Sequence, residues 1–375
     1  MKTSVFIVYH DLDYNARSQE MLETAKLLSD RVILLSQSKP KMADDRVECH
    51  VCPKTAASYF KFLHMAKRIL NSTKPDFVLL HDNYTAPILK YIVKRKMNVP
   101  VIYDSSELYI DRKLNKPVQR IMHSYMENAE IDYLKNALIS IAANEERAQI
   151  MTKEMHLERP TLVFDNMHRI DDPVDTVFCD KKYADILRSG KVNILYAGGL
   201  SPARRSFELA ETVAKLGEGY NLIITGRNMT ENGTETLKTI LKKYGQNNVH
   251  YMDQVPRSEL KYLLGKVDFS VSVFAQDTMN NIYCASGKLY ESIFEGVPVL
   301  TSENPPLARL CREKHVGVSD NDFKNGILTL TENLSEYKVA VHKYRKNIDY
   351  EGRVADLARR LSVYIDKYQR GEITL

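Results

Sequence analysis

The chain has 375 residues, of which 44% are hydrophobic and 27% charged, and its formal net charge is +5 at pH 7. This composition is that of an ordinary globular protein. The length predicts two domains, each large enough for its own core. No apolar run reaches the roughly 18–20 residues that a membrane-spanning helix needs.

The first eleven residues contain an apolar run that is too short for a signal peptide, and no small-residue cleavage site follows it. We therefore expect this run to be the first β-strand. The five cysteines are an odd number spread over both halves, which favours reduced thiols in a cytosol. These features predict a cytoplasmic protein.

Short apolar runs alternate with helical patterns along the first half of the chain. Strands are predicted at 4–9, 32–35, 77–80, 99–103, 138–142 and 161–164, and the clearest helical patterns lie at 19–28, 57–70 and 117–134. Near-continuous Val/Ile/Leu strands joined by helices indicate a parallel sheet that is covered on both faces.

The same alternation restarts after a polar break at 166–191. Strands are predicted at 192–197, 222–225, 249–252, 269–273 and 297–301. The expected fold is therefore α/β, with two doubly wound parallel-sheet (Rossmann-like) domains that face each other across a cleft. Ligands of such sheets bind outside the carboxyl ends of the strands.

The most informative segment is 284–300, with the sequence CASGKLYESIFEGVPVL. Ser286 and Gly287 open an amphipathic helix, whose free N–H groups and partial positive charge suit a phosphate. Lys288 adds a full positive charge. Glu291 lies one turn further along the same face and can accept hydrogen bonds from a ribose diol. The alternative is an exposed ion pair of Lys288 with Glu291.

Four stretches resemble, in the same order, segments of family-4 (group 1) glycosyltransferases, which have the GT-B fold: 79–89, 103–109, 194–216 and 284–300. The likeness covers roughly residues 1 to 360. It implies an N-terminal acceptor-side domain (1–168) and a C-terminal nucleotide-sugar-binding domain (169–349). It further implies that a final helix within 350–375 packs back on the first domain.

The resemblance also implies a donor site in the second domain. Paired glycines let the backbone approach a ligand closely, and an arginine fork suits two phosphate oxygens. Arg205 aligns best with the basic residue that grips the donor diphosphate in the family, and Arg204 is its neighbour. The predicted donor-binding residues are Gly198, Gly199, Arg204, Arg205, Gly226, Arg227, Ser286, Gly287, Lys288 and Glu291.

Catalytic and acceptor residues are expected in the first domain. The catalytic candidates are His81, Asp82, Ser106 and Glu107, and Asp13 and Arg17 are predicted on the acceptor side. His81 and Asp82 have an alternative role, as a strand-end pair satisfied by the backbone. Two residues depart from the family pattern: serine stands at 106 where relatives often have histidine, and tyrosine at 283 where many have glutamate.

By resemblance, the protein is a retaining, metal-independent hexosyltransferase. It would use a nucleotide diphosphate sugar as co-substrate, without a further cofactor and without metal ligands. The acceptor would be a hydroxyl of a glycan or lipid-linked acceptor in bacterial surface polysaccharide synthesis, for capsule or lipopolysaccharide. The alternatives are a non-catalytic GT-B partner subunit, a sugar phosphorylase and a sugar-nucleotide epimerase.

The segment 54–120 is basic, with thirteen Lys/Arg against five Asp/Glu. Lys90, Lys94, Arg95 and Lys96 cluster around apolar residues, a pattern that can lie on the anionic inner face of the cytoplasmic membrane. A solvated helix face is the alternative. The segment lacks interleaved aromatic platforms and a recognisable binding motif, so no nucleic-acid partner is expected.

Overall fold

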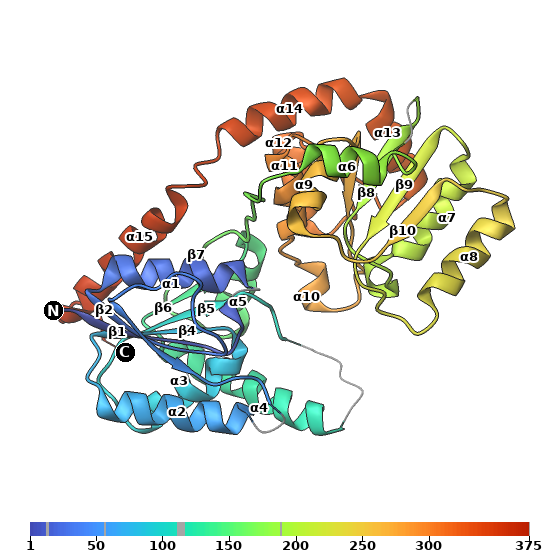
Figure 1. Cartoon of the computed structure of the whole chain (residues 1–375). Coiled ribbons are helices and arrows are strands. Elements are labelled where there is room, and N and C mark those ends of the chain that lie inside the picture. Colours follow the sequence, from blue (N-terminus) through green and yellow to red (C-terminus); the bar gives the residue numbers. More distant parts are fainter. Residues whose placement is uncertain (13–14, 56–57, 111–116, 188–189, 375) are drawn as a thin grey trace. The chain divides into compact units, whose positions relative to one another are not determined.

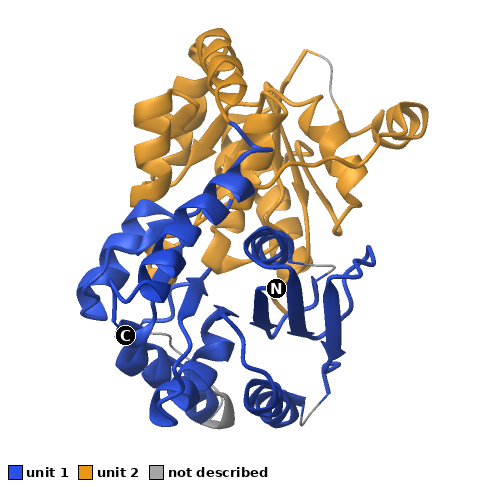
Figure 2. Ribbon diagram, turned by 90° about the vertical axis from the view of Figure 1, so that its left-hand side faces the viewer, with its two compact units in different colours: residues 1–166, 349–375 blue, residues 167–348 orange. Residues whose placement is uncertain are grey.

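The computed structural model describes all residues of the chain except 13–14, 56–57, 111–116, 188–189 and 375. It divides into two compact units, which are coloured separately in Figure 2. Unit 1 comprises residues 1–166 and 349–375, and unit 2 comprises residues 167–348. Each unit is built on one parallel sheet with helices on both faces. The predicted fold class, two doubly wound parallel sheets, is confirmed.

The described residues of unit 1 form a seven-stranded sheet in the order β3-β2-β1-β4-β5-β6-β7. Its strands are β1 (Thr3–Val8), β2 (Arg31–Ser36), β3 (Val47–Val51), β4 (Phe77–His81), β5 (Val101–Ser105), β6 (Ile139–Ala142) and β7 (Leu162–Val163). The central strands β4 and β5 are buried along their whole length, as expected for a sheet covered on both faces. The strand order reverses between β1 and β4, and ligands of such sheets bind at the carboxyl ends of the strands beside a reversal.

Helices cover both faces of this sheet. They are α1 (Ala16–Leu28), α2 (Ser58–Ser72), α3 (Ala86–Lys94), α4 (Pro117–Tyr133), α5 (Glu145–Glu154) and α15 (Arg353–Gln369), with short 3₁₀ turns η2 (Asn83–Thr85) and η3 (Leu134–Asn136). Figure 1 shows α1 and α15 on one face and α2, α3 and α4 on the other. Leu357, Leu361 and Ile365 of α15 join Met21 of α1 in one buried cluster. Residues 349–375 therefore complete the core of unit 1.

The described residues of unit 2 form a six-stranded sheet in the order β10-β9-β8-β11-β12-β13. Its strands are β8 (Val192–Tyr196), β9 (Tyr220–Thr225), β10 (Val249–Met252), β11 (Phe269–Ser272), β12 (Val299–Thr301) and β13 (Gly317–Ser319). The short edge strand β13, with its glycine and serine, has no predicted counterpart. The order reverses between β8 and β11, so the expected ligand crevice of this sheet lies where these two strands end.

The helices of unit 2 also cover both faces. They are α6 (Thr176–Tyr183), η4 (Pro202–Arg204), α7 (Ser206–Leu216), α8 (Gly233–Tyr244), α9 (Arg257–Leu264), α10 (Met279–Ile282), α11 (Gly287–Phe294), α12 (Pro305–Lys314), α13 (Phe323–Glu332) and α14 (Leu334–Lys346). Helices α7, α8 and α13 pack on one face, and α6 and α9 on the other. Helix α6 lies inside the polar segment that was predicted as the break. The Asp175 side chain caps it, and Cys179 and Tyr183 are buried.

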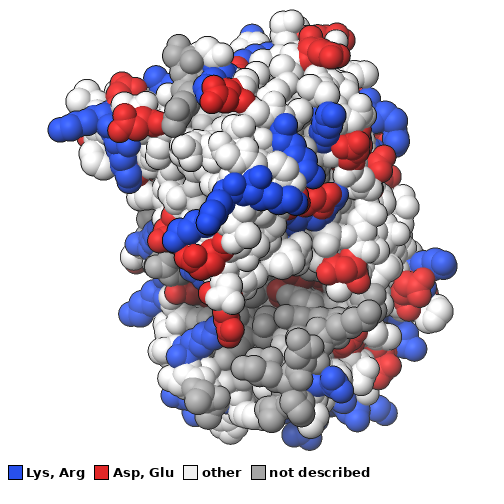
Figure 3. Space-filling model, turned by 90° about the vertical axis from the view of Figure 1, so that its right-hand side faces the viewer, with Lys and Arg blue, Asp and Glu red and all other residues white. Residues whose placement is uncertain are grey.

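The basic helix of the sequence analysis is α3, and its apolar side is turned inward. Ile88, Leu89 and Ile92 are buried in unit 1, which leaves the basic residues at the end of the helix exposed. The apolar face therefore serves the protein core instead of a lipid phase. None of the helices in the described part of the chain combines the length and apolar character needed to cross a bilayer. On the face in Figure 3, basic and acidic side chains are interspersed.

Candidate functional site

In unit 2, the loops that follow β8, β9 and β11 are held together at the carboxyl edge of the sheet. The backbone N–H of Leu200 donates to the carbonyl of Arg227, and the N–H of Ala275 donates to the carbonyl of Ala203, at 3.1 and 2.9 Å. These contacts join the loops on both sides of the strand-order reversal. They place the predicted donor residues on one edge of one sheet.

Gly199 and Gly226 are required by the packing of the two loops that carry them. Gly199 has a φ of +71°, and a Cβ atom there would lie 2.2 Å from the carbonyl oxygen of Arg227. Gly226 has a φ of +133°, and its Cβ would lie 2.7 Å from the nitrogen of Gly199. Both conformations disfavour residues with side chains. The glycines therefore allow the two loops to pack backbone against backbone.

The two adjacent arginines have different surroundings. Arg205 pairs with Glu208 at 2.6 Å, and its guanidinium also donates to the side chain and carbonyl of Asn321. Arg204 lies over the ring of Phe274 at 4.2 Å and forms no ion pair within the described residues. Resemblance favoured Arg205 as the diphosphate ligand. In the structure, Arg204 has the more available guanidinium, because the donors of Arg205 already have protein partners.

Helix α11 carries a cluster of charged side chains at this edge. Ser286 caps its first turn by accepting from the N–H of Leu289, and its hydroxyl also bonds to Ser272 at the end of β11, at 2.8 Å. Lys288 Nζ lies 2.9 Å from Glu291 Oε2. Glu291 is 2% exposed, whereas Lys288 is 49% exposed. The carboxylate is thus fixed within the fold, and the lysine can reach a ligand.

Arg257 is a member of this cluster that the sequence analysis missed. Its Nη1 lies 3.3 Å from Glu291 Oε1, and its Nη2 donates to the carbonyl of Arg169 at 2.9 Å. Arg257 begins α9 and is 34 residues before Glu291, so no local spacing reveals the contact. Each carboxylate oxygen has two acceptor positions, so Glu291 can hold both cations and still accept from a ligand hydroxyl.

In unit 1, a buried ion network lies under the carboxyl edge of the sheet. Arg17 Nη2 lies 2.6 Å from Asp104 Oδ1, with the two side chains 3% and 0% exposed. His81 Nδ1 lies 2.7 Å from Asp104 Oδ2. Burial alone would raise the pKa of Asp104, but the charges of Arg17 and His81 lower it to about 2. Arg17, predicted on the acceptor side, thus supports Asp104 from within the core.

A second histidine–carboxylate pair lies in front of this network. His10 follows β1, and its Nε2 lies 3.1 Å from Oδ2 of Asp82, which follows β4. Burial alone would raise the pKa of Asp82, but the hydrogen bond with His10 and the neighbouring histidine charges bring it below the ordinary value. Sequence reasoning found Asp82 and missed His10. The available signal was that His10, like His81, directly follows the end of a predicted strand.

The remaining predicted residues of unit 1 have other surroundings. Ser106 offers its carbonyl to the guanidinium of Arg147 on α5. Glu107 is 43% exposed and pairs with the same arginine at 3.3 Å. Asp13 lies outside the described residues. Ser106 and Glu107 are therefore linked to α5, and the structure records no bond between them and His81 or Asp82.

Glu130 of α4 is a buried carboxyl group close to this edge. It is 2% exposed and accepts a hydrogen bond from the Ser105 hydroxyl at 3.0 Å. Burial, with the nearby negative charge of Asp82, raises the pKa of Glu130 to about 8. The folded protein therefore holds a proton near neutral pH that the unfolded chain releases.

We expect Glu130→Gln to stabilise the protein, increasingly so as pH rises. Below pH ~4.5 both states of the wild type bind the proton, and between that pH and about 8 only the folded state does. The free energy of unfolding of the wild type therefore falls across this window, by up to about 5 kcal/mol at about 1.4 kcal/mol per pKa unit. The glutamine variant lacks this fall. Urea unfolding at pH 5 and pH 8 measures it.

The exposed Glu154 of α5 supplies the control for this experiment. Its carboxylate is 50% exposed and pairs only loosely, at 3.6 Å, with Lys153. Glu154→Gln should change the free energy of unfolding by less than about 0.5 kcal/mol at either pH. Equal stability of wild type and Glu130→Gln at pH 8 would contradict a proton held by Glu130.

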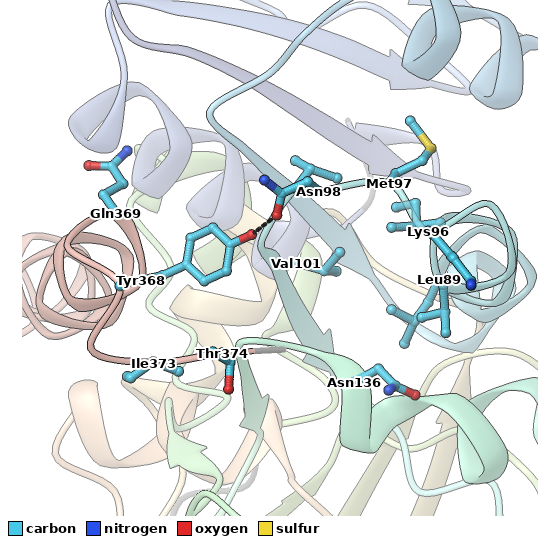
Figure 4. A pocket seen from close by; sticks show the side chains of 14 residues that line it. Leu89, Lys96, Met97, Asn98, Val101, Asn136, Tyr368, Gln369, Ile373 and Thr374 are labelled. Carbon is cyan, nitrogen blue, oxygen red and sulfur yellow. Dashed lines mark hydrogen bonds between the residues drawn. The ribbon is translucent and has the colours of Figure 1, made fainter.

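A cavity of about 610 Å³ lies elsewhere in unit 1, between the end of α3, the start of β5 and the segment after α15. Figure 4 shows Leu89, Val101 and Ile373 among its lining residues, and the Tyr368 hydroxyl donates to Asn98 Oδ1 at 2.6 Å beside it. Val101 is the first residue of β5, so this cavity lies at the amino edge of the sheet. His10 and Asp82 are at the opposite, carboxyl edge.

Two units, each built on a doubly wound parallel sheet, define the GT-B class of architecture. Among solved structures, the chain resembles WaaG, a glycosyltransferase involved in lipopolysaccharide biosynthesis, with a TM-score of 0.67 over 95% of this chain and 98% of that one, at 14% identity. It also resembles HepE of Anabaena in complex with UDP and glucose, with a TM-score of 0.69 over 97% and 100%, at 14% identity.

The chain also resembles a third solved structure over nearly its whole length. Sucrose-phosphate synthase of Thermosynechococcus elongatus superposes with a TM-score of 0.65 over 99% of this chain and 98% of its own, at 12% identity. No model of a known protein family matches the sequence, and no curated protein sequence matches it. At these identities the likeness establishes the GT-B fold, and the activity is argued from the site.

Proposed function

We propose that this protein is a glycosyltransferase, which moves a hexose-type sugar from a nucleotide diphosphate sugar to a hydroxyl of a glycan or lipid-linked acceptor. The observation that carries the proposal is the cluster at the start of α11, where Lys288 and Arg257 flank the buried Glu291. It lies in a fold whose solved relatives include HepE in complex with UDP-glucose.

The chemistry of this cluster suits a nucleoside diphosphate. The first N–H groups of α11 and the Lys288 ammonium would bind phosphate oxygens, and Glu291 would accept hydrogen bonds from ribose hydroxyls. The exposed Arg227, and Arg204, whose guanidinium lies over the ring of Phe274, supply further positive charge at the same edge. Positive charge that is already in place stabilises a departing diphosphate as its own charge develops.

Two finer features of the proposed reaction come from the resemblance to family-4 enzymes. The transferred sugar would keep its anomeric configuration, and the cations of unit 2 would replace a metal ion. NMR coupling constants of the anomeric proton in the product test the first. Activity that is unchanged by EDTA supports the second.

For the cellular role, we propose bacterial surface polysaccharide synthesis at the inner face of the cytoplasmic membrane. WaaG, a structural neighbour, is a glycosyltransferase involved in lipopolysaccharide biosynthesis. The exposed Lys94, Arg95 and Lys96 at the end of α3 give unit 1 a basic surface that can approach anionic headgroups.

Thermal unfolding with millimolar UDP, GDP, ADP or CMP, with and without EDTA, tests the proposal. A ligand at about 100 times its dissociation constant adds about 2.7 kcal/mol to stability. For a unit of this size, the midpoint should then rise by roughly 5–10 °C. We expect one nucleoside diphosphate to give this shift in the presence of EDTA, with inorganic phosphate as the negative control.

No shift with any nucleotide would contradict the proposal and would favour the non-catalytic GT-B partner subunit. Nucleotide sugar that is converted without a hydroxyl acceptor would instead indicate an epimerase. Sugar transfer that depends on free phosphate would indicate a phosphorylase. The identity of the shifting nucleotide names the donor class for product analysis.

A further inference from the structure

We infer that the cavity at the amino edge of the unit 1 sheet binds a sugar residue of a glycan. Its volume of about 610 Å³ is within the usual range of small-molecule sites. The lining residues come from the second half of α3 and the loop after it, the first residue of β5, the turn η3, and the last residues of α15 with the segment that follows. All of them belong to unit 1, so the site is complete within one unit.

Apolar side chains form the part of the cavity that adjoins the core. Leu89 and Ile92 of α3 are buried, as is Val101 at the start of β5. Ile373 is partly buried and packs against the core cluster of unit 1. Figure 4 shows Tyr368 on one side of the cavity and Leu89 on the other, with Val101 between them. The cavity can therefore cover an apolar face of a ligand.

The rest of the lining carries amide and hydroxyl groups that are open to solvent. Asn98, Gln369 and Thr374 are exposed, and Asn136 is half-buried. The Tyr368 hydroxyl donates to Asn98 Oδ1 at 2.6 Å, and no bond from Asn98 Nδ2 is recorded within the described residues. Both N–H donors of this amide are therefore available to a ligand. The cavity thus combines an apolar floor with a rim of hydrogen-bonding groups.

A pyranose ring matches this combination, because it has C–H groups on its faces and hydroxyl groups around its edge. The ring of Tyr368 offers a broad apolar surface for the C–H groups, and amide groups can both donate to hydroxyls and accept from them. Tyr368 is already held in place by its bond to Asn98 and by packing against the core cluster of unit 1. Binding therefore costs little side-chain entropy at this position.

Three other classes of ligand fit the lining less well. A nucleoside diphosphate needs several cations, and Lys96 is the single charged side chain among the described lining residues. A metal ion such as Ca²⁺ needs carboxylates, and none is found in the described part of the lining. A lipid acyl chain would cover the amides without forming hydrogen bonds to them, which costs free energy.

The place of the cavity separates it from the expected reaction site of unit 1. Val101 begins β5 and Ser105 ends it, so the cavity lies at the amino edge of the sheet. Ligands that react on doubly wound sheets bind at the carboxyl edge. A sugar held in the cavity is therefore not the reacting one. That it belongs to the acceptor glycan rests on the proposed function: the cavity then holds a distant residue of the polymer and raises its local concentration at the enzyme.

NMR of the full-length chain with labelled isoleucine methyl groups tests this site. The δ1 methyl resonance of Ile373 is assigned by its absence in Ile373→Val. Methyl glycosides of glucose, galactose, mannose, rhamnose, N-acetylglucosamine and glucuronic acid are then titrated through the millimolar range. A ligand of this size is expected to bind with a Kd of about 1–10 mM. We expect at least one glycoside to shift the Ile373 resonance until saturation, equally with and without UDP.

Two variants and two matched controls locate the binding. Tyr368→Ala should weaken it by about tenfold or more through loss of the ring, and Asn98→Ala by about 3–10-fold through loss of hydrogen bonds. Tyr364 is the control for the ring, because it is also on α15 and packs against the same core cluster but does not line the cavity. Asn71 is the control for the amide, because it accepts from the Tyr91 hydroxyl at 3.0 Å on the surface. We expect wild-type affinity when either control residue is replaced by alanine.

Absence of a saturable Ile373 shift with every glycoside would overturn the sugar site, and a nucleotide-induced thermal shift in the same protein would leave the proposed function standing. Wild-type affinity in Asn98→Ala would also overturn the site, even if Tyr368→Ala failed to fold. A shift with octanoate or inorganic phosphate alone would replace the sugar by an acyl chain or an anion. Glycoside binding without any nucleotide-induced thermal shift would support the sugar site and contradict the proposed function.

Discussion

Lys288→Ala is expected to lower turnover about 10²–10³-fold, the effect of removing one preorganised group that stabilises developing charge. The ammonium lies at the first turn of α11, where the departing diphosphate would meet the helix N-terminus. The same change should scarcely affect folding. Lys288 is half exposed, so its pair with Glu291 contributes at most about 1 kcal/mol, and Arg257 still neutralises the carboxylate.

Steady-state kinetics and thermal unfolding of the same preparations separate these two effects. Lys238 on α8 provides the matched control, because it forms a comparable i,i+3 pair with Glu235 at 2.8 Å but is 72% exposed. Lys238→Ala should retain the wild-type kcat and the wild-type nucleotide shift. Full turnover in Lys288→Ala would remove α11 from the proposed donor site.

Arg17→Met should destabilise unit 1 by about 3–5 kcal/mol, because it leaves the charge of Asp104 buried without its main partner. With about 2–4 °C per kcal/mol for a unit of this size, the midpoint falls by roughly 10 °C. The sign of the pH dependence follows from the pKa of Asp104, which is lowered to about 2. The stability that this pair contributes is present above pH ~4 and is lost as pH falls toward 2.

The deficit of Arg17→Met should therefore be largest near pH 7 and shrink toward pH 3, as measured by urea unfolding across this range. Adding Asp104→Asn should restore part of the stability, since no uncompensated charge then remains. Arg31, whose pair with Glu48 is 44% exposed on both sides, is the control. Arg31→Met should cost less than about 1 kcal/mol. If Arg17→Met also lowered the free energy of unfolding by less than about 1 kcal/mol, the buried ion network would be contradicted.

Much of the fold could be predicted because the central strands of each sheet are continuous apolar runs. The runs at β1, β4 and β8 are long enough to be recognised without tertiary information, and their alternation with helices fixes the class. Strand β13 was missed because three residues with a glycine and a serine carry no such signal. Helix α6 was missed because it has only eight residues, and only two of its side chains are buried.

In the candidate site, contacts within one helix could be predicted from the sequence, and contacts between distant segments could not. Lys288 and Glu291 are one helical turn apart, so their spacing alone predicts the pair. His10 and Asp82 are 72 residues apart, and nothing local links them. Their contact follows from strand order, which places β1 beside β4 and which the sequence leaves open. Arg257 and Glu291 are likewise far apart in the sequence, and the fold of unit 2 brings the first residue of α9 to the side chain of Glu291 on α11.

The position of α15 has a consequence for how the protein is made. Residues 1–166 of unit 1 are synthesised before unit 2, but the core of unit 1 also needs Leu357, Leu361 and Ile365, which are synthesised after all of unit 2. Unit 2 is a single continuous stretch of chain and can fold as soon as it emerges. Until α15 is synthesised, the apolar side of α1 has no covering helix. Exposed apolar surface of this kind is prone to aggregation, which chaperones counter. Unit 2 can therefore complete its fold before unit 1, although residues 1–166 of unit 1 are synthesised first.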